Sequence, residues 1–310
     1  MSFNRAIPKL PPQFRGKWNQ KTYHVLRELG RGANGAVYLV SQDGVRRAVK
    51  IGAEGMDILM EVHALKSVQQ GRDARVTVAP LLCDVDDLYI DGRSCTFYAM
   101  EYLDGEQLDQ FVQRTGTDWV PVLIIQLLAR LAVLHQRGWV FGDLKPENVI
   151  VTRADSQVRL IDFGGVTKHG CAVRQFTEEY DRAAWHAGDR RAEPAYDLFS
   201  LAVMTVRLAS SPEVWKSSRT EPRQTSLLCD IIRNNDSLYP FRVPLIKAFH
   251  GQYAGAEEMK SDMLAIVQGR TTAVQQKKAS GSGSSGIWIG GLFVASMLLL
   301  AGTLYYAWMM

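Results

Sequence analysis

Cysteine is scarce in this chain of 310 residues, and its four cysteines lie far apart, at Cys83, Cys95, Cys171 and Cys229. No C-x-x-C pair occurs, so the ligand spacing of a structural zinc site is missing. Four scattered thiols do not form a disulfide framework either, and a reducing cytosolic setting is the simpler interpretation. The sequence therefore excludes a small fold that is held together by disulfides or zinc.

A large excess of one charge is also missing. The formal net charge is +4 and no basic stripe interleaved with aromatic residues occurs, so no nucleic-acid partner is predicted. The first twenty residues are polar, contain proline and lack an apolar run, so no secretory signal is predicted. We interpret residues 1–22 as a loose lead-in to a globular chain of one or two domains.

Glycine occurs in one informative string. Gly30, Gly32 and Gly35 form G-x-G-x-x-G between two strand-like runs, and glycine lets backbone N–H groups approach phosphate oxygens. In a Rossmann unit such a string opens a helix, whereas here V-Y-L-V continues as a strand. A D-G hairpin turn then leads to R-R-A-V-K-I, which places Lys50 on the next strand.

Two helices are predicted from apolar spacing. The first, M-D-I-L-M-E-V-H-A-L-K-S-V, carries Glu61, which is suited to meet the buried ammonium of Lys50; a solvated helix face is the alternative. The second covers residues 120–136 and is strongly apolar, but its short length, polar ends and Arg130 distinguish it from a membrane span. On this helix His135 is expected to be a packed core histidine rather than a ligand.

The stretch from Trp139 to Gly164 combines polar groups with apolar strand-like runs. It reads W-V-F-G-D-L-K-P-E-N-V-I-V and, after a polar turn, R-L-I-D-F-G-G. A pair of strands here would project Asp143, Asn148 and Asp162 towards one point. Asp and Asn oxygens suit Mg²⁺, and a remaining carboxylate can orient a hydroxyl nucleophile.

Asp143, Asn148 and Asp162 have the spacing of the protein-kinase catalytic loop and D-F-G segment. Over residues 23–268 the chain resembles a eukaryotic-like Ser/Thr protein kinase. The resemblance implies a bilobal α+β fold, with ATP and Mg²⁺ as cofactors and protein serine or threonine, its own included, as substrate. The implied parts are a small β-rich N-lobe, a hinge and a larger helical C-lobe, at residues 23–100, 101–105 and 106–268.

The resemblance also implies the chemical roles. Asp143 orients the substrate hydroxyl and accepts its proton, while Asn148 and Asp162 hold the metal ions. Lys145 contacts the transferred phosphoryl group and marks Ser/Thr enzymes; a surface charge is the alternative. Thr177 is expected to meet Asp143 and Lys145.

A nucleotide pocket is implied between the lobes. Lys50, held by Glu61, places the phosphates, and Met100 guards the back of the pocket. Asp197 braces the catalytic loop from below, a role compatible with a simple helix N-cap. The implied nucleotide-binding residues are Gly30, Gly32, Gly35, Val37, Ala48, Lys50, Glu61, Glu101 and Leu103.

The chain departs from the family pattern in two places. Phe141 and Gly142 replace the His-Arg of H-R-D, and that arginine receives the phosphorylated activation loop in many relatives. We therefore predict a non-RD kinase, with constitutive or otherwise regulated activity. The A-P-E position reads R-A-A, so the glutamate that pairs with a later arginine is replaced by Ala184. A less firmly anchored substrate-binding loop is expected.

These departures motivate an alternative, a pseudokinase that acts as a nucleotide-binding membrane scaffold. Against it, every residue that handles phosphate or metal is present. A small-molecule phosphotransferase on a related fold is a second alternative. The D-L-K-P-E-N and D-F-G strings, together with Thr177, favour protein substrates.

The longest apolar run lies at the C-terminal end. Residues 269–286 are predicted to be a flexible linker, and residues 287–310 carry no charge and are long enough to cross a bilayer as one helix. Lys277 and Lys278 precede this run and no basic residue follows it, so the kinase domain is expected on the cytoplasmic side. We predict a tail-anchored protein of a prokaryotic inner membrane, with a homodimer through small residues of the span.

Overall fold

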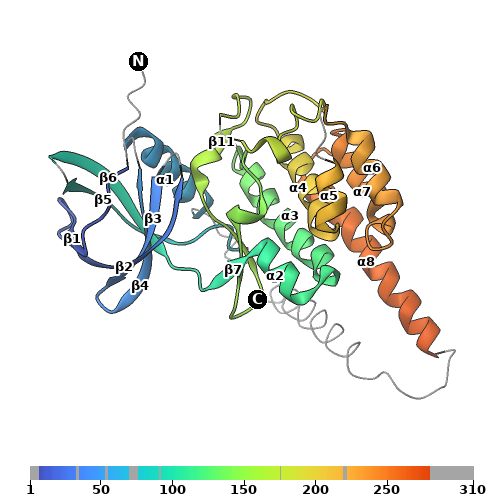
Figure 1. The fold of residues 1–310 in the computed structure, drawn as a ribbon, viewed down its shortest axis with the longest axis horizontal. Coiled ribbons are helices and arrows are strands. Elements are labelled where there is room, and N and C mark those ends of the chain that lie inside the picture. The colour runs from blue at the N-terminus through green and yellow to red at the C-terminus, as the bar shows by residue number, and fades with distance from the viewer. Residues whose placement is uncertain are drawn as a thin grey trace. The chain divides into compact units, whose positions relative to one another are not determined.

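The computed structural model describes residues 7–32, 35–52, 55–69, 76–90, 92–174, 176–218 and 222–279. The chain divides into two units, residues 1–266 and 267–310. The first unit has the expected α+β, bilobal arrangement, and Figure 1 shows its β-rich N-lobe in blue to teal and its helical C-lobe in green to orange.

The N-lobe is a six-stranded sheet with one helix. All neighbouring strands are antiparallel, in the order β1-β2-β3-β4-β6-β5. Asp43 and Gly44 join β3 to β4 with φ angles of 51° and 79°, as a two-residue hairpin requires. The elements are β1 (Gln13–Arg15), β2 (Thr22–Gly32), β3 (Gly35–Gln42), β4 (Val45–Gly52), α1 (Gly55–Gln69), β5 (Leu82–Ile90) and β6 (Arg93–Glu101).

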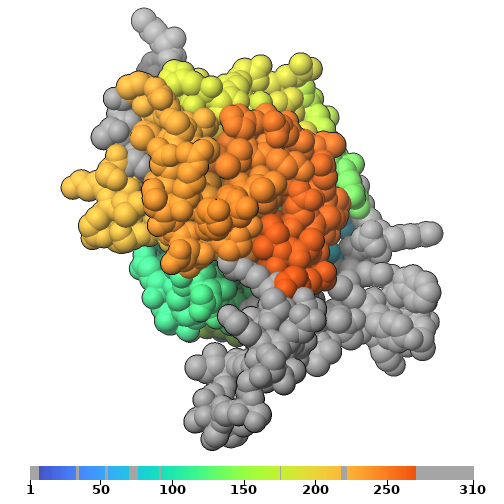
Figure 2. All heavy atoms as spheres, turned by 90° about the vertical axis from the view of Figure 1, so that its right-hand side faces the viewer, coloured from blue at the N-terminus to red at the C-terminus, as the bar shows by residue number. Residues whose placement is uncertain are grey.

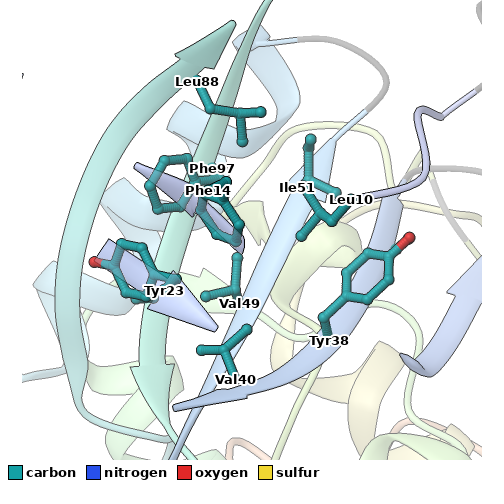
Figure 3. Packing of buried hydrophobic residues seen from close by; sticks show 11 residues of the cluster. Leu10, Phe14, Tyr23, Tyr38, Val40, Val49, Ile51, Leu88 and Phe97 are labelled. Carbon is teal, nitrogen blue, oxygen red and sulfur yellow. The ribbon is translucent and has the colours of Figure 1, made fainter. Parts of the chain in front are cut away.

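The segment before residue 23 belongs to the N-lobe, so its interpretation as a loose lead-in is wrong for residues 7–22. Phe14 is buried and stacks on Tyr23 at 5.1 Å between ring centroids, with Phe97 edge-on at 5.3 Å (Figure 3). The carboxylate of Asp86 accepts hydrogen bonds from the backbone N–H groups of two residues that follow β1. A strand of three residues is too short to show an alternating pattern, which is why the sequence did not reveal it.

The C-lobe is mainly helical. Figure 2 shows α6 and α7 in orange on its outer face. Its helices are α2 (Leu108–Thr115), α3 (Val120–Gln136), α4 (Pro194–Ala209), α5 (Pro212–Ser218), α6 (Thr225–Arg233), α7 (Arg242–Phe249) and α8 (Ala256–Ala279). Its short strands, β7 (Gly105–Gln107), β8 (Trp139–Val140), β9 (Val149–Thr152), β10 (Val158–Leu160) and β11 (Thr167–Lys168), form a β10-β9-β7 sheet and a β11-β8 pair.

Helix α3 forms the centre of the C-lobe. Among the described residues, Thr117–Gln136 is the one helical stretch long and apolar enough to cross a membrane by length and composition, with a mean hydropathy of 1.6. Half of it is buried inside the protein, and its leucines contribute to the C-lobe core. This burial agrees with its interpretation as a core helix.

The C-terminal boundary differs from the expectation. Helix α8 continues to Ala279, so a flexible linker beginning at residue 269 is wrong for residues 269–279. These residues are mostly good helix formers that extend an existing helix without a new nucleation step. The rest of the predicted linker and the predicted membrane span, residues 280–310, lie outside the described residues.

Replacing Phe14 with alanine should lower the stability of the protein by about 3 kcal/mol, because the lost ring leaves a cavity beside Tyr23 and Phe97. Urea unfolding followed by intrinsic fluorescence measures the change. Gln13→Ala, at an exposed position of the same strand, is the matched control and should alter stability by less than about 0.5 kcal/mol. Equal unfolding midpoints for the two variants would contradict the role of β1 in the core.

Candidate active site

A buried ion pair links the N-lobe sheet to α1. Lys50 on β4 and Glu61 on α1 are 3% and 2% exposed, and the Lys50 Nζ lies 2.8 Å from both carboxylate oxygens of Glu61. The same Nζ donates to Asp162 Oδ1 at 2.6 Å. The expected lysine–glutamate pair is therefore present, and the burial of Glu61 excludes a solvated helix face.

The ionisation of this group follows from its burial and charges. Burial opposes the charge of Lys50, but the carboxylates of Glu61 and Asp162 outweigh it and raise the pKa of Lys50. Burial raises the pKa of Glu61, while at Asp162 the nearby ammonium outweighs burial and lowers the pKa. The ionic contact of Asp162 is thus present above the ordinary carboxyl pKa and is lost as the pH falls through the lowered value.

Tyr98 is a functional neighbour that the sequence reasoning missed. Its buried hydroxyl donates to Glu61 Oε2 at 2.8 Å, and it pairs with Lys50 in the register of β4 and β6. This second donor holds the Glu61 carboxylate in place. The apolar run of β6 indicated a buried strand, but it does not reveal which residue of α1 Tyr98 meets.

The catalytic loop brings the predicted hydroxyl-handling residues together. Thr177 donates from Oγ1 to Asp143 Oδ1 at 2.8 Å, and Lys145 Nζ donates to Asp143 Oδ2 at 2.7 Å and to Thr177 Oγ1 at 3.0 Å. Asn148 Nδ2 donates to the Asp143 carbonyl at 2.8 Å. Lys145 is thus part of the site and not a surface charge.

Asp197 holds the catalytic loop from α4. It is fully buried and accepts the backbone N–H groups of Phe141 at 2.7 Å and Gly142 at 2.9 Å. His135 is buried as predicted, but its Nε2 also lies 2.9 Å from Asp197 Oδ2, a contact that the sequence reasoning missed. The N-cap residue of α4 is Glu193, so the alternative of a simple N-cap for Asp197 is wrong.

The D-F-G segment has its aspartate in the left-handed region. Asp162 has φ 61° and ψ 78°, and its carboxylate accepts the Gly164 N–H at 3.4 Å as well as the bond from Lys50. Phe163 is buried against Phe141, with ring centroids 5.7 Å apart. A non-glycine residue with this backbone costs about 1 kcal/mol or more, a strain typical of functional positions.

Gly142, the glycine of the F-G-D string, lies where there is no room for a side chain. Its φ is 81°, and a Cβ at this position would lie 2.6 Å from the carbonyl oxygen of Gly165. Glycine therefore lets the catalytic loop pass close to the D-F-G segment.

The glycines expected to approach the phosphates lie on the N-lobe sheet. Gly30 and Gly32 are on β2 and Gly35 begins β3, while residues 33–34 lie outside the described residues. A Cβ on Gly35 would lie 2.7 Å from the Ile51 carbonyl oxygen and 3.2 Å from Lys50 Cε. The glycine thus permits the close approach of strands around Lys50, the lysine expected to place the phosphates.

The expected adenine-binding residues flank the end of β6. Val37 pairs with Lys50 in the β3–β4 register, and Ala48 pairs with the buried Met100 in the β4–β6 register. The Glu101 N–H donates to the Leu81 carbonyl at 2.8 Å, so it is already used within the sheet. Within the described part of the chain, the Leu103 N–H has no hydrogen-bond partner and is available to a ligand.

The donor set fits Mg²⁺. The Asn148 side chain donates from Nδ2 to Asp143, which leaves its Oδ1 as a neutral oxygen ligand. The Asp162 side chain is 53% exposed and uses Oδ1 for Lys50, so its second oxygen remains. A carboxylate and an amide oxygen match the preference of Mg²⁺ for few protein ligands beside phosphates.

The substrate-binding loop makes charged contacts that do not involve the missing glutamate, and its weaker anchoring stays a prediction. Arg182 Nη1 lies 2.6 Å from Glu193 Oε1, and its Nε donates to the Ala187 carbonyl at 2.9 Å. One residue earlier, the buried Asp181 pairs with Arg190 at 2.7 Å. Charged contacts other than the expected glutamate therefore hold this segment.

Comparisons with known proteins agree with this geometry. The protein kinase domain matches residues 23–278, and the chain belongs to the protein kinase family. It is similar to serine/threonine-protein kinase YabT of Bacillus subtilis, with 42% identity over 268 residues that cover 86% of this chain and 78% of YabT. Its activity is that of a protein-serine/threonine kinase.

Two further comparisons concern more distant proteins. Serine/threonine-protein kinase PknD of Mycobacterium tuberculosis is 28% identical over 256 residues, which cover 77% of this chain but 36% of PknD. The structure of vaccinia related kinase 3 superposes with a TM-score of 0.63 at 16% identity, covering 86% of this chain and 94% of that one. The second likeness shows the protein kinase fold.

Gly142→Ala should lower kcat by roughly tenfold or more, because the added Cβ would displace the loop that carries Asp143. Steady-state phosphotransfer kinetics measure the change. Gly170→Ala is the matched control, since Gly170 has a similar φ of 84° but open space at its Cβ position. Equal losses in both variants would attribute the effect to backbone strain and contradict the close approach to Gly165.

Proposed function

We propose that this kinase transfers the γ-phosphate of Mg-ATP to protein hydroxyls while anchored to a membrane, with Asp143 as the catalytic base. The observation that supports the site assignment most directly is the bonded group of Thr177, Asp143 and Lys145 beside Asn148. A carboxylate, an ammonium and an amide are thereby held where a hydroxyl and a phosphate would meet.

Each side chain has its own role in the proposed reaction. Asp143 accepts the proton of the incoming hydroxyl, with Thr177 fixing one of its oxygens. Lys145 supplies positive charge next to that carboxylate and to the phosphoryl group in transfer. Lys50, positioned by Glu61, holds the α- and β-phosphates.

The same set would hold the metal. Asn148 and Asp162 would bind Mg²⁺, which when bound neutralises charge on the phosphate oxygens. The glycine string of β2 and β3 would cover the phosphates, and the backbone near Glu101 and Leu103 would bind the adenine edge. Catalysis is then mostly positioning and charge neutralisation.

We also propose that activity does not depend on phosphorylation of the activation segment, residues 163–184. Gly142 offers no arginine to receive a phosphate there. The hydroxyl residues of this segment are Thr167, Thr177 and Tyr180. The first two hydroxyls donate to Gly165 and Asp143 respectively, and Tyr180 is buried. This is the non-RD behaviour predicted from F-G-D.

Phosphatase-treated protein should transfer labelled γ-phosphate from Mg-ATP to serine or threonine of a protein acceptor. Asp143→Asn should lower kcat by roughly a hundredfold to ten-thousandfold, because the proton acceptor is lost while its shape is kept. Asp162→Ala should lower turnover by orders of magnitude and raise the Mg²⁺ concentration needed for the half-maximal rate, because one metal ligand is lost. The measurement is phosphotransfer at varied Mg²⁺, followed by phosphoamino-acid analysis.

Asp118→Asn, at an exposed aspartate beside α3, is the matched control and should leave kcat unchanged. Mg-ATP binding without transfer would favour the scaffold over the enzyme. Transfer to small molecules but not to proteins would favour the second alternative. Activity that disappears with phosphatase treatment would contradict independence from phosphorylation.

The proposal that the protein is anchored to a membrane rests on the composition of its C-terminal residues. Residues 287–310 carry no charge and follow a Gly/Ser-rich stretch and two lysines, which supports a single span with the kinase domain in the cytoplasm. A prokaryotic inner membrane and a homodimer through the span stay predictions.

Exchanging Met297 and Leu299 for arginine should release the protein from membranes, since each central arginine opposes insertion by about 2.5–3.5 kcal/mol. Carbonate extraction of cell membranes measures the retained fraction. Arginines at Ser282 and Ser284, outside the apolar run, add the same charge and should leave the protein membrane-bound. Equal partition of both variants would refute the anchor.

A further inference from the structure

Asp181 is a buried carboxylate, three residues before the Ala184 that stands in place of the expected glutamate. Its side chain has no exposed surface. Arg190 donates to Oδ2 from Nη2 at 2.7 Å and from Nε at 3.0 Å, and Tyr196 donates its hydroxyl to Oδ1 at 2.8 Å. The backbone N–H groups of Ala183 and Ala184 add bonds of 3.4 and 3.2 Å. A buried carboxylate with these donors is held in one position.

Arg190 extends this contact towards the catalytic residues. Its guanidinium lies over the ring of Phe176, 4.0 Å from the centroid. Phe176 directly precedes Thr177, whose hydroxyl bonds to Asp143. The carbonyl of Arg190 also accepts the Val173 N–H at 2.8 Å. One arginine thus contacts the activation segment near its middle and at its end.

The backbone around Arg190 runs beside the first part of the same segment. The Gly170 N–H donates to the Ala192 carbonyl at 2.9 Å, and the Ala192 N–H donates to the Cys171 carbonyl at 2.8 Å. Phe176 packs against a small apolar cluster. The cluster consists of Val140, Val173, Ala192 and Tyr196.

The first turn of α4 joins this arrangement to the catalytic loop. Tyr196, which holds Asp181, is followed by Asp197, which holds the backbone of Phe141 and Gly142. Both α4 residues are fully buried. The same helical turn therefore sets the positions of the proton-accepting loop and of the segment that presents the substrate.

We propose that the Asp181–Arg190 clamp, held by Tyr196, keeps the activation segment in its substrate-binding position, in place of both a phosphate and the missing glutamate. A fixed carboxylate meets the arginine fork through two N–H groups, the geometry that a phosphate on a hydroxyl would otherwise offer to an arginine. Asp181 and Arg190 are positioning residues, because neither touches the reacting groups. The proposal rests on the phosphotransfer proposed for Asp143.

Hydrogen exchange of the full-length, phosphatase-treated protein tests the clamp directly. Arg190→Gln should speed exchange of the backbone amides of residues 170–177 by roughly tenfold or more, because their bonds open when the clamp is lost. Arg190→Lys keeps the charge but not the fork and should give a smaller increase. Arg191→Gln, at the exposed neighbouring arginine, is the matched control and should leave exchange unchanged.

Kinetics separate positioning from loss of the fold. In Arg190→Gln the KM for the protein acceptor should rise roughly tenfold, while the KM for ATP stays within about twofold, since Lys50 and the hinge are untouched. Asp181→Asn should act in the same direction. The double variant should be no worse than the more severe single variant, because both changes remove one interaction.

Exchange in Arg190→Gln that equals that of Arg191→Gln would overturn the clamp. So would equal rises in KM for acceptor and ATP, which indicate general loosening. If the unchanged protein transfers no phosphate, the proposed function fails, and the exchange measurement still decides whether the clamp holds the segment.

Discussion

The ammonium of Lys50 contacts carboxylates from both lobes, and much of the structure depends on it. A lysine 3% exposed is stable only when carboxylates meet it, and here Glu61 comes from α1 and Asp162 from the D-F-G segment. The contact with Glu61 requires α1 to pack against the sheet. The contact with Asp162 requires the C-lobe loop to adopt its left-handed backbone. One buried charge therefore couples the positions of the helix, the sheet and Asp162.

In the C-lobe, the first turn of α4 makes a comparable set of buried polar contacts. Asp197 satisfies the backbone of the catalytic loop and contacts His135, while the preceding Tyr196 contacts Asp181. Each is buried, so each polar group needs a partner, and these partners include the two loops that are proposed to carry out phosphotransfer. The two departures from the family pattern become understandable here. Gly142 leaves room for the carbonyl oxygen of Gly165. Asp181 supplies a carboxylate near the position where the expected glutamate is absent.

Neutral bonds support these charged contacts. Tyr98 gives the Glu61 carboxylate a donor besides the lysine, and Thr177 does the same for Asp143. A carboxylate with two donors has less freedom to rotate than one with a single ionic partner. This second donor helps each carboxylate to keep a defined orientation before a substrate binds.

The amino-acid sequence alone indicated the order of the motifs, the strand after the glycine string, the place of Lys50 on the next strand, and the loop that carries Asp143 and Asn148. These depend on short spacings and on local turn chemistry, which a single chain segment carries. It did not indicate β1, whose three residues have no readable period, nor the end of α8, where helix formers precede the glycine-rich stretch.

Which polar groups meet depends on the tertiary structure. Tyr98 and Glu61 are 37 positions apart, and His135 and Asp197 are 62 apart. Asp181 and Arg190 are only nine apart, yet their pairing depends on the irregular path of the chain between them. Partner choice of this kind follows from burial, because a buried polar group must be satisfied by whichever donor the fold brings within reach.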